Sequence, residues 1–353
     1  AARMCRNSAR PAPLGTPTTR PRRSEPGARA GVPRAPARPH IAAPRTSEPS
    51  VRGYRAGMSL KRLVVGVDFT PSSEVAVARA AELAAHHGAE LVLVHAGTVP
   101  ERPEVPPSMV AARDAYLGVL SDNLAHDRAR LAELHQRLVA GGINASQVIV
   151  DRFPDDALVE TAAEFGADLI VTGARPLAGA RRWFLGSVAA KVVRAAGCSV
   201  LCARPGDPDH GFSRIVVGTD FSDGAARALA RAIDVAEAGA TIDVVHAIEL
   251  GWGPTVAPTE LAIGDQALRD ELRRDVTARG EALVAPWRDA DVTIRFHALD
   301  ERPRDLVRAQ AEAANADLIV VGGVGHRGLR RWLLGSVAED IVNDAPCSVL
   351  VAR

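Results

Sequence analysis

The segment Leu63-Val-Val-Gly-Val-Asp-Phe-Thr70 decides the fold, because it returns later in the chain as Ile215-Val-Val-Gly-Thr-Asp-Phe-Ser222. Four further segments also occur twice, and their first residues pair as Gly88 with Gly239, Gly166 with Asn315, Arg181 with Arg330, and Cys198 with Cys347. The copies lie about 150 residues apart, whereas solenoid repeats have periods of roughly 20 to 50 residues. The chain therefore contains a duplicated domain.

Each copy alternates short apolar runs with Ala-rich stretches of helical character. The runs are nearly continuous, which is typical of parallel strands that are covered on both faces. The expected strands are 62–67, 89–95, 146–150, 167–172 and 198–203 in the first copy, and 213–219, 241–246, 292–297, 316–321 and 347–352 in the second. Long amphipathic helices are expected over 108–140 and 259–288. The pattern predicts an α/β fold with a five-stranded parallel sheet in each copy.

The formal net charge of +1 conceals an uneven distribution. Residues 1–57 contain 12 Arg, no Lys, two Glu and 10 of the 24 prolines, so this leader is cationic and the remaining chain carries a net charge of −9. An acidic body argues against a domain that binds nucleic acid through phosphate contacts. No apolar run approaches the ~20 residues that span a bilayer, so no membrane association is expected.

The leader has almost no large aliphatic residues, so it is expected to be disordered. Its composition leaves three interpretations open: a transit peptide, a basic arm for nucleic acid, or a stretch that is not part of the native protein. We favour the third, with Met58 as the true start. The domains are then expected at 58–204 and 213–353, joined by a Pro/Gly/Asp linker at 205–212.

A glycine-rich loop follows the fourth expected strand of the second copy and precedes a helix. Its spacing is Gly322-x2-Gly325-x9-Gly335-Ser336. Glycine permits positive φ and lets backbone N–H groups approach a ligand closely, and a helix N-terminus attracts anions. The loop also carries four basic side chains, His326, Arg327, Arg330 and Arg331. These features predict a phosphate-binding loop.

Asp220 ends the first expected strand of the second copy. Ligands of α/β sheets bind at the carboxyl ends of the strands where the strand order reverses, so Asp220 and Gly322 flank that crevice if the order reverses between strands one and four. A carboxylate there suits ribose hydroxyls or the adenine amino edge. The plainer interpretation is a loop with Ser336 as an ordinary N-cap, because a lone Gly-x2-Gly is weak evidence. The recurrence of the arrangement in both copies favours a ligand site.

On these residues the chain resembles a tandem universal stress protein, a family whose nucleotide motif is Gly-x2-Gly-x9-Gly-(Ser/Thr). The resemblance covers about 60–204 and 213–353. It implies two adenine-nucleotide α-hydrolase-like (Rossmann-like) sandwiches of sheet order 3-2-1-4-5, with ATP as ligand, alone or with Mg²⁺. The implied nucleotide-binding residues are Asp220, Gly322, Gly325, His326, Arg327, Gly335, Ser336 and Val337.

The first copy departs from this motif, because it reads Gly173-x2-Pro176-x9-Gly186-Ser187. Proline fixes φ and donates no N–H, so one phosphate contact and the shape of the loop change. The remaining candidates in this copy are Asp68, Gly173, Gly186 and Ser187. We expect the first copy to bind nucleotide weakly or not at all.

Other chemistry-bearing residues give no enzyme signature. His95 and His246 end the second expected strand of each copy, and we interpret them as packing or hydrogen-bonding residues rather than catalytic ones. No metal cluster, Ser–His–Asp set or kinase motif accompanies the loop, so no catalytic or metal-binding residue is predicted and at most slow ATP hydrolysis is expected. Four scattered cysteines fit no disulfide scaffold and favour a reducing cytoplasm.

The main hypothesis is a cytoplasmic, ATP-binding stress-response regulator that acts through nucleotide-dependent conformation or partner binding. The alternatives are a slow nucleotide-dependent hydrolase or transferase on the same fold, and a ligand-free interaction module. The two apolar last strands would leave exposed edges, so we expect them to pair within the chain, as such edges pair across dimers in the resembled family. A homodimer of the tandem chain is a further expectation.

Overall fold

The computed structural model describes residues 59–97, 104–176, 183–184, 186–204, 211–248, 262–323 and 334–353. All of these residues belong to one compact unit of the chain, Glu48–Arg353. The leader at 1–57 and the expected start at Met58 lie outside the described residues, as does most of the expected linker. No helix in the described part of the chain is both long and apolar enough to cross a membrane.

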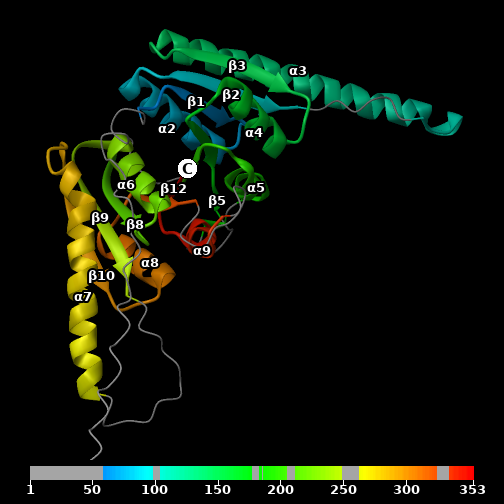
Figure 1. Cartoon of the computed structure of the whole chain (residues 1–353). Coiled ribbons are helices and arrows are strands. Elements are labelled where there is room, and N and C mark those ends of the chain that lie inside the picture. Colours follow the sequence, from blue (N-terminus) through cyan, green and yellow to red (C-terminus); the bar gives the residue numbers. More distant parts are fainter. Residues whose placement is uncertain are drawn as a thin grey trace, which may run out of the picture. The chain divides into compact units, whose positions relative to one another are not determined.

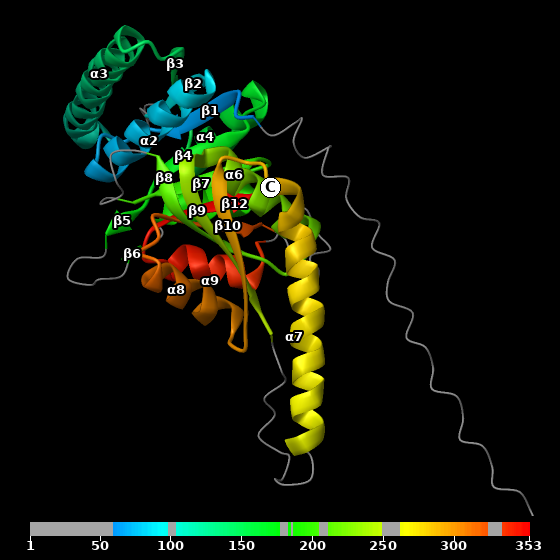
Figure 2. The same cartoon turned by 90° about the vertical axis from the view of Figure 1, so that its left-hand side faces the viewer.

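Ten of the described strands form one sheet in which two halves of five strands follow each other (Figures 1 and 2). The first half has β1 (Arg62–Gly66), β2 (Glu90–Ala96), β3 (Ala145–Val150), β4 (Leu169–Gly173) and β7 (Ser199–Ala203). The second half has β8 (Phe212–Gly218), β9 (Ala236–Ala247), β10 (Val292–Leu299), β11 (Leu318–Gly322) and β12 (Ser348–Ala352). Pairing inside each half is parallel, and the order there is third, second, first, fourth, fifth. The predicted α/β fold is confirmed.

The helices cover both faces of this sheet. The first half contains α2 (Pro71–His87), α3 (Val110–Ala140), α4 (Pro154–Phe165) and α5 (Ser187–Ala195), with a short 3₁₀ turn, η1 (Pro107–Met109), before α3. The second half contains α6 (Asp223–Val235), α7 (Ala262–Val284), α8 (Pro303–Ala313) and α9 (Ser336–Asp344), with η2 (Ala285–Trp287) after α7. One apolar cluster joins the sheet to α2, α3, α6 and α7, and the other joins it to α4, α5, α8 and α9.

The copies differ where the first helix meets the second strand. In the first half Gly88 ends α2 in the left-handed region, with φ of 62°. In the second half α6 ends at Val235, the cap residue Ala236 is already extended, and the glycine with positive φ, Gly239, lies inside the strand. β9 therefore begins earlier than the predicted 241–246, because no left-handed glycine stands where α6 stops.

The two halves meet where β7 and β12 pair in antiparallel fashion, with Leu201 opposite Leu350. Arg204 follows β7 and is only 1% exposed. Its backbone N–H donates to Ser348 Oγ (2.9 Å), and its guanidinium donates to the carbonyl oxygens of Val342 (3.2 Å) and Ala345. The side chain of Arg204 therefore caps the C-terminal end of α9, where cations are favoured.

Arg353 makes the reciprocal contact from the end of β12. Its backbone N–H donates to Ser199 Oγ (3.2 Å), and its guanidinium donates to the carbonyl oxygens of Val193 (2.5 Å) and Arg194 (3.3 Å) near the end of α5. Burial lowers the pKa of Arg353. Each half thus supplies an arginine that caps the last helix of the other half.

An ion pair joins the last two helices of each half, and its positive and negative residues stand on opposite helices in the two halves. In the first half, Lys191 on α5 pairs with Asp155 on α4 at 3.1 Å. In the second half, Arg304 on α8 pairs with Asp340 on α9 at 3.7 Å. The cation therefore stands on the last helix in one half and on the preceding helix in the other.

A group of ionisable residues lies where the end of α2 meets α6. Arg231 is buried and pairs with Asp234 at 2.8 Å. Burial raises the pKa of Asp234 to about 6, and the Arg231 cation opposes that rise. His87, beside them, has its pKa lowered by burial and by electrostatic interaction with His86 and Arg231. The neutral form of His87 is therefore favoured in the folded chain.

Replacing His87 with leucine should weaken the acid sensitivity of the fold. Because the folded pKa of His87 lies below its ordinary value of 6.5, its contribution to stability is present above pH 6.5 and is lost as the pH falls through the folded pKa. Asp234 acts with the opposite sign: its contribution to stability is present below pH 3.8, its ordinary pKa, and is lost as the pH rises through about 6. Comparing variant and wild type at each pH cancels that contribution.

Urea unfolding midpoints measured between pH 7.5 and 5 test this prediction. The wild type should lose more stability over that range than the His87→Leu variant. The same substitution at solvent-exposed His126 controls for the loss of a histidine. Parallel curves for wild type and His87→Leu would contradict the expected role of His87.

Candidate functional site

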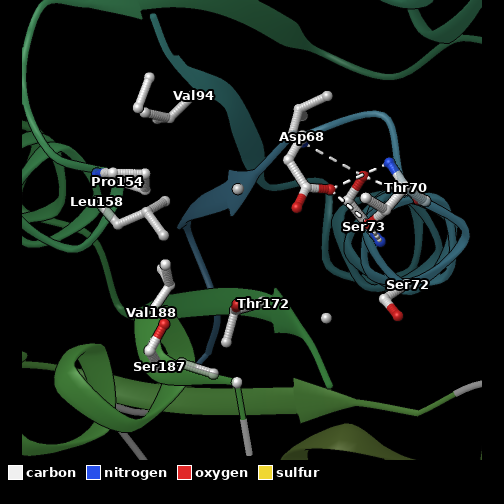
Figure 3. Close-up of a pocket in the computed structure, with 16 residues that line it drawn as sticks. Asp68, Thr70, Ser72, Ser73, Val94, Pro154, Leu158, Thr172, Ser187 and Val188 are labelled. Carbon is white, nitrogen blue, oxygen red and sulfur yellow. Dashed lines mark hydrogen bonds between the residues drawn. The ribbon is translucent and has the colours of Figure 1, made fainter. Parts of the chain in front are cut away.

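A pocket of about 330 Å³ opens at the carboxyl ends of β1 and β4 in the first half. Its volume is at the lower end of the range for small-molecule sites, roughly 300 to 1,000 Å³. Figure 3 shows Asp68, Thr70 and Ser73 on the α2 side, with Val94, Pro154 and Leu158 across the pocket and Thr172, Ser187 and Val188 below. The pocket lies between β1 and β4, where the strand order reverses.

Asp68 is exposed and is held at the entrance to α2 by a small hydrogen-bonded turn. Thr70 donates to Asp68 Oδ1 from its backbone N–H (3.1 Å) and from its hydroxyl (2.5 Å), and the N–H of Asp68 donates to Ser73 Oγ (3.3 Å). Thr70 is also the N-cap of α2, because its hydroxyl oxygen accepts from the N–H of Ser73. These local contacts help to orient the carboxylate.

The helix α5 forms the other wall of the pocket. Its N-cap is Gly186, which has φ of −54° and provides no side-chain cap, and Ser187 is the first helical residue. The N-terminal N–H groups of a helix lack partners within the helix and favour anions. Gly186 and Ser187 both line the pocket, so this wall can donate backbone hydrogen bonds to a negatively charged group.

The second half repeats these elements. Asp220 follows β8, is exposed, and accepts the backbone N–H of Ser222 at 3.0 Å; Ser222 in turn caps α6. Gly335 is the N-cap of α9 with φ of −64°, so Ser336 starts the helix and is not the N-cap that the plainer interpretation expected. Val337 follows and is 37% exposed.

The central part of the second-half loop cannot be compared. Gly325, His326, Arg327, Arg330 and Arg331 lie outside the described residues.

The glycines at the ends of the fourth strands have a packing role that the sequence did not indicate. Gly173, Gly186, Gly322 and Gly335 do not belong to the residues with positive φ. A Cβ on Gly173 would stand 2.3 Å from the carbonyl oxygen of Ser72, and one on Gly322 would stand 2.7 Å from the carbonyl carbon of Gly224. These two glycines therefore allow the strand to pass close to the first turn of α2 or α6.

In the first half, the segment that contains Pro176 forms a small extra sheet. β5 (Arg175–Pro176) pairs in antiparallel fashion with β6 (Trp183–Phe184). The sequence showed no alternating pattern long enough to predict this pair. Pro176 thus belongs to a strand at the position where the second copy has Gly325.

A family model described as the universal stress protein family matches residues 59–204 and 211–353. These matches cover both halves of the sheet and most of the chain. The chain belongs to the universal stress protein family. The resemblance identified from the loop and strand motifs is therefore confirmed.

Similar proteins include universal stress proteins of comparable length. One from Mycobacterium tuberculosis is 29% identical over 305 residues, covering 82% of this chain and 96% of the relative. A crystal structure of a universal stress protein from Archaeoglobus fulgidus has a TM-score of 0.58 and 19% identity, covering 83% of this chain and 98% of the other. A universal stress protein solved in complex with cAMP is 30% identical, with a TM-score of 0.29, and covers 41% of this chain and 97% of its own.

Several residues that line the pocket of this universal stress protein were missed from the sequence. They are Gly66, Val67, Thr70, Ser72, Ser73, Val94, Ala96, Pro154, Leu158, Thr172, Val188 and Ala189. Their shared signal is position, since most lie at the carboxyl end of a strand or in the first turn of the helix that follows. Among the described residues no group of three or more His, Cys, Asp or Glu side chains could hold a metal ion.

Proposed function

We propose that this universal stress protein binds ATP in its second half and works as a stress-response regulator through nucleotide-dependent conformation or partner binding. The observation that carries the proposal is the repeated pairing of an exposed aspartate after the first strand with a helix that begins without a side-chain cap. In the second half these are Asp220 and the Gly335-Ser336 start of α9. β8, which precedes Asp220, and β11, which leads toward α9, are neighbours at the reversal of strand order.

The assigned roles follow from the chemistry of ATP. Asp220 accepts hydrogen bonds from the ribose hydroxyls, and the N–H groups at Gly335, Ser336 and Val337 donate to phosphate oxygens. Gly322 gives the strand end room beside α6. We assign the phosphate loop to Gly325, His326 and Arg327, whose glycine and cations suit a triphosphate, alone or with Mg²⁺.

The first half is proposed as the weaker site, with Asp68, Gly173, Gly186 and Ser187 as its candidate residues. Pro176 supports this ranking because it lies in β5 and has no N–H to donate. We further propose that the pairing of β7 with β12 joins the two halves in solution, and that two chains form a homodimer. The described cysteines, Cys198, Cys202 and Cys347, are free thiols, which supports a cytoplasmic location.

Isothermal titration of the full chain with ATP tests the proposal. We expect the wild type to bind about one ATP, and Asp220→Ala or Gly325→Pro to weaken that binding at least about tenfold, equivalent to 1.4 kcal/mol. The matched control is Asp122→Ala, which removes an exposed aspartate from α3. Pro176→Gly should move the stoichiometry toward two.

Two results would contradict the assignment. Equal, tight binding of two ATP molecules by the wild type would refute the ranking of the two halves. No binding by the wild type, together with no nucleotide released from the purified protein in a mass spectrum, would refute the ATP proposal itself.

A further inference from the structure

Two phenylalanines adopt a backbone conformation that large side chains rarely take. Phe69 has φ of 58° and Phe221 has φ of 59°. In the described part of the chain the other non-glycine residue with positive φ is Asn315, and asparagine tolerates this region well. A bulky residue in the left-handed region costs free energy and persists only where its surroundings impose it. The same conformation at equivalent positions of both copies indicates a shared requirement.

In the second half, the ring of Phe221 contacts a histidine and an arginine. The ring of His246 is 4.5 Å from that of Phe221, and His246 Nδ1 lies 2.8 Å from the carbonyl oxygen of Thr219. The guanidinium of Arg279 on α7 stands over the Phe221 ring, 4.3 Å from its centroid, a distance typical of a cation–π contact. Three side chains from β9, the β8–α6 turn and α7 therefore hold this turn together.

The charge state of His246 fits this arrangement. Burial lowers the pKa of His246, and the Arg279 cation lowers it further, while the Thr219 carbonyl and Asp220 oppose the change. The ring is therefore neutral near pH 7 and donates its Nδ1–H to the Thr219 carbonyl. A neutral imidazole packs beside the Arg279 cation without charge repulsion.

The first half repeats the arrangement with different residues. The ring of His95 is 5.3 Å from that of Phe69, and His95 Nδ1 lies 2.8 Å from the carbonyl oxygen of Val67. Arg130 on α3 stands 4.2 Å from the Phe69 ring centroid. The strained phenylalanine, the histidine and the arginine of a long helix thus occur together in both copies.

Each strained phenylalanine directly follows the aspartate of its candidate site. The φ of Phe221 sets the direction in which the chain leaves Asp220 and enters α6. Ordinary core packing would not need a strained backbone, since an apolar residue with negative φ can fill the same face. The strain therefore points to control of the neighbouring carboxylate.

We propose that Phe69 and Phe221, each in contact with a histidine and an arginine, are positioning residues that fix the carboxylates of Asp68 and Asp220 toward the ribose hydroxyls of a bound nucleotide. This inference rests on the proposed function. It assigns His246 and Arg279 to the site in the second half, and His95 and Arg130 to the site in the first, although neither His95 nor Arg130 lines the first-half pocket.

A double-mutant cycle on the full chain tests the inference in the second half. We expect Phe221→Ala to weaken ATP binding about tenfold, because alanine cannot hold the aromatic contacts and the turn relaxes. In an Asp220→Ala background the same substitution should change affinity by less than about twofold, since the group that it positions is gone. Arg279→Met should show a smaller loss with the same dependence on Asp220.

The second readout is discrimination between ATP and its 2′-deoxy and 3′-deoxy analogues. The wild type should prefer ATP over at least one analogue by about tenfold, and Phe221→Ala should reduce that preference to about twofold, because a hydrogen bond from the hydroxyl to a positioned Asp220 is what distinguishes them. Arg274→Met, on the same helix α7, is the matched control for Arg279→Met and should keep the full preference. A merely structural role would weaken ATP and its analogues equally.

The outcomes separate this inference from the proposed function. The positioning role alone is overturned if the wild type binds ATP but Phe221→Ala weakens the binding of ATP and its analogues equally. It is also overturned if the loss of affinity from Phe221→Ala adds fully to the loss from Asp220→Ala. Absence of ATP binding by the wild type overturns the proposed function and the inference together. Circular dichroism of each variant shows that it is folded before titration.

Discussion

Replacing Gly173 with alanine should lower the free energy of unfolding by about 3 kcal/mol, within the range for overpacked sites. The reason is the close passage of β4 beside the first turn of α2. A Cβ on Gly173 would stand 2.3 Å from the carbonyl oxygen of Ser72 and 2.5 Å from its carbonyl carbon. Both atoms belong to the backbone, so the helix or the strand must move.

Gly322→Ala should also lower the free energy of unfolding, by a smaller amount of about 2 kcal/mol. Its Cβ would stand 2.7 and 2.8 Å from the carbonyl group of Gly224. Urea unfolding followed by circular dichroism measures both changes. The control is Gly118→Ala on α3, where no atom lies within 4 Å of the added Cβ and alanine should stabilise the helix by about 0.5 to 1 kcal/mol. Unchanged midpoints for Gly173→Ala would refute the close-passage argument.

Replacing Arg204 with methionine should cost about 3 kcal/mol and weaken the connection between the two halves. Methionine keeps much of the apolar stem but removes the guanidinium that caps α9, so the carbonyl oxygens of Val342 and Ala345 lose charge-assisted donors in a buried setting. Removing the desolvation cost of a buried cation acts in the opposite direction. We expect the loss to win, because those carbonyls have no access to water at a site that is 1% exposed.

Arg194→Met is the matched control for Arg204→Met. Arg194 also joins the last helices of the two halves, through its ion pair with Glu339, but both side chains are substantially exposed, so the loss should stay below about 1 kcal/mol. Unfolding of each variant is followed by circular dichroism and by tryptophan fluorescence. We expect the unfolding transitions seen by the two probes to be separate for Arg204→Met. They should coincide for the wild type and for Arg194→Met. An Arg204→Met midpoint equal to that of wild type would contradict it.

The parts of the fold that could be predicted depend on local pattern. The continuous apolar runs around Val64 and Val216 predicted buried parallel strands, and the duplication supplied each prediction twice. Asp68 and Asp220 were placed correctly at strand ends because the carboxyl end of a strand can be recognised from where its apolar run stops. The candidate loop of the second half stays a prediction, since its central residues lie outside the described part of the chain.

The parts that could not be predicted depend on contacts between distant segments. The close approach of Gly173 to Ser72 joins residues that are far apart in sequence, so nothing in the sequence indicated the packing constraint on this glycine. The positive φ of Phe221 accompanies ring contacts with His246 and Arg279 from other elements, and no propensity indicates it. Arg204 likewise resembles a linker residue until β12 and α9 cover it.

The reversed polarity of the two helix pairs has a consequence for how a tandem chain folds. Near-identical neighbouring domains risk exchanging equivalent segments during folding. If α5 and α9 changed places, Asp155 would face Asp340 and Arg304 would face Lys191, so both contacts would become repulsive. In the native pairs the side chains are exposed except that of Asp155, which is 15% exposed, so the pairs contribute little stability themselves. Their charge pattern instead disfavours the exchange of α5 and α9 between the two copies, so each helix packs in its own half of the chain.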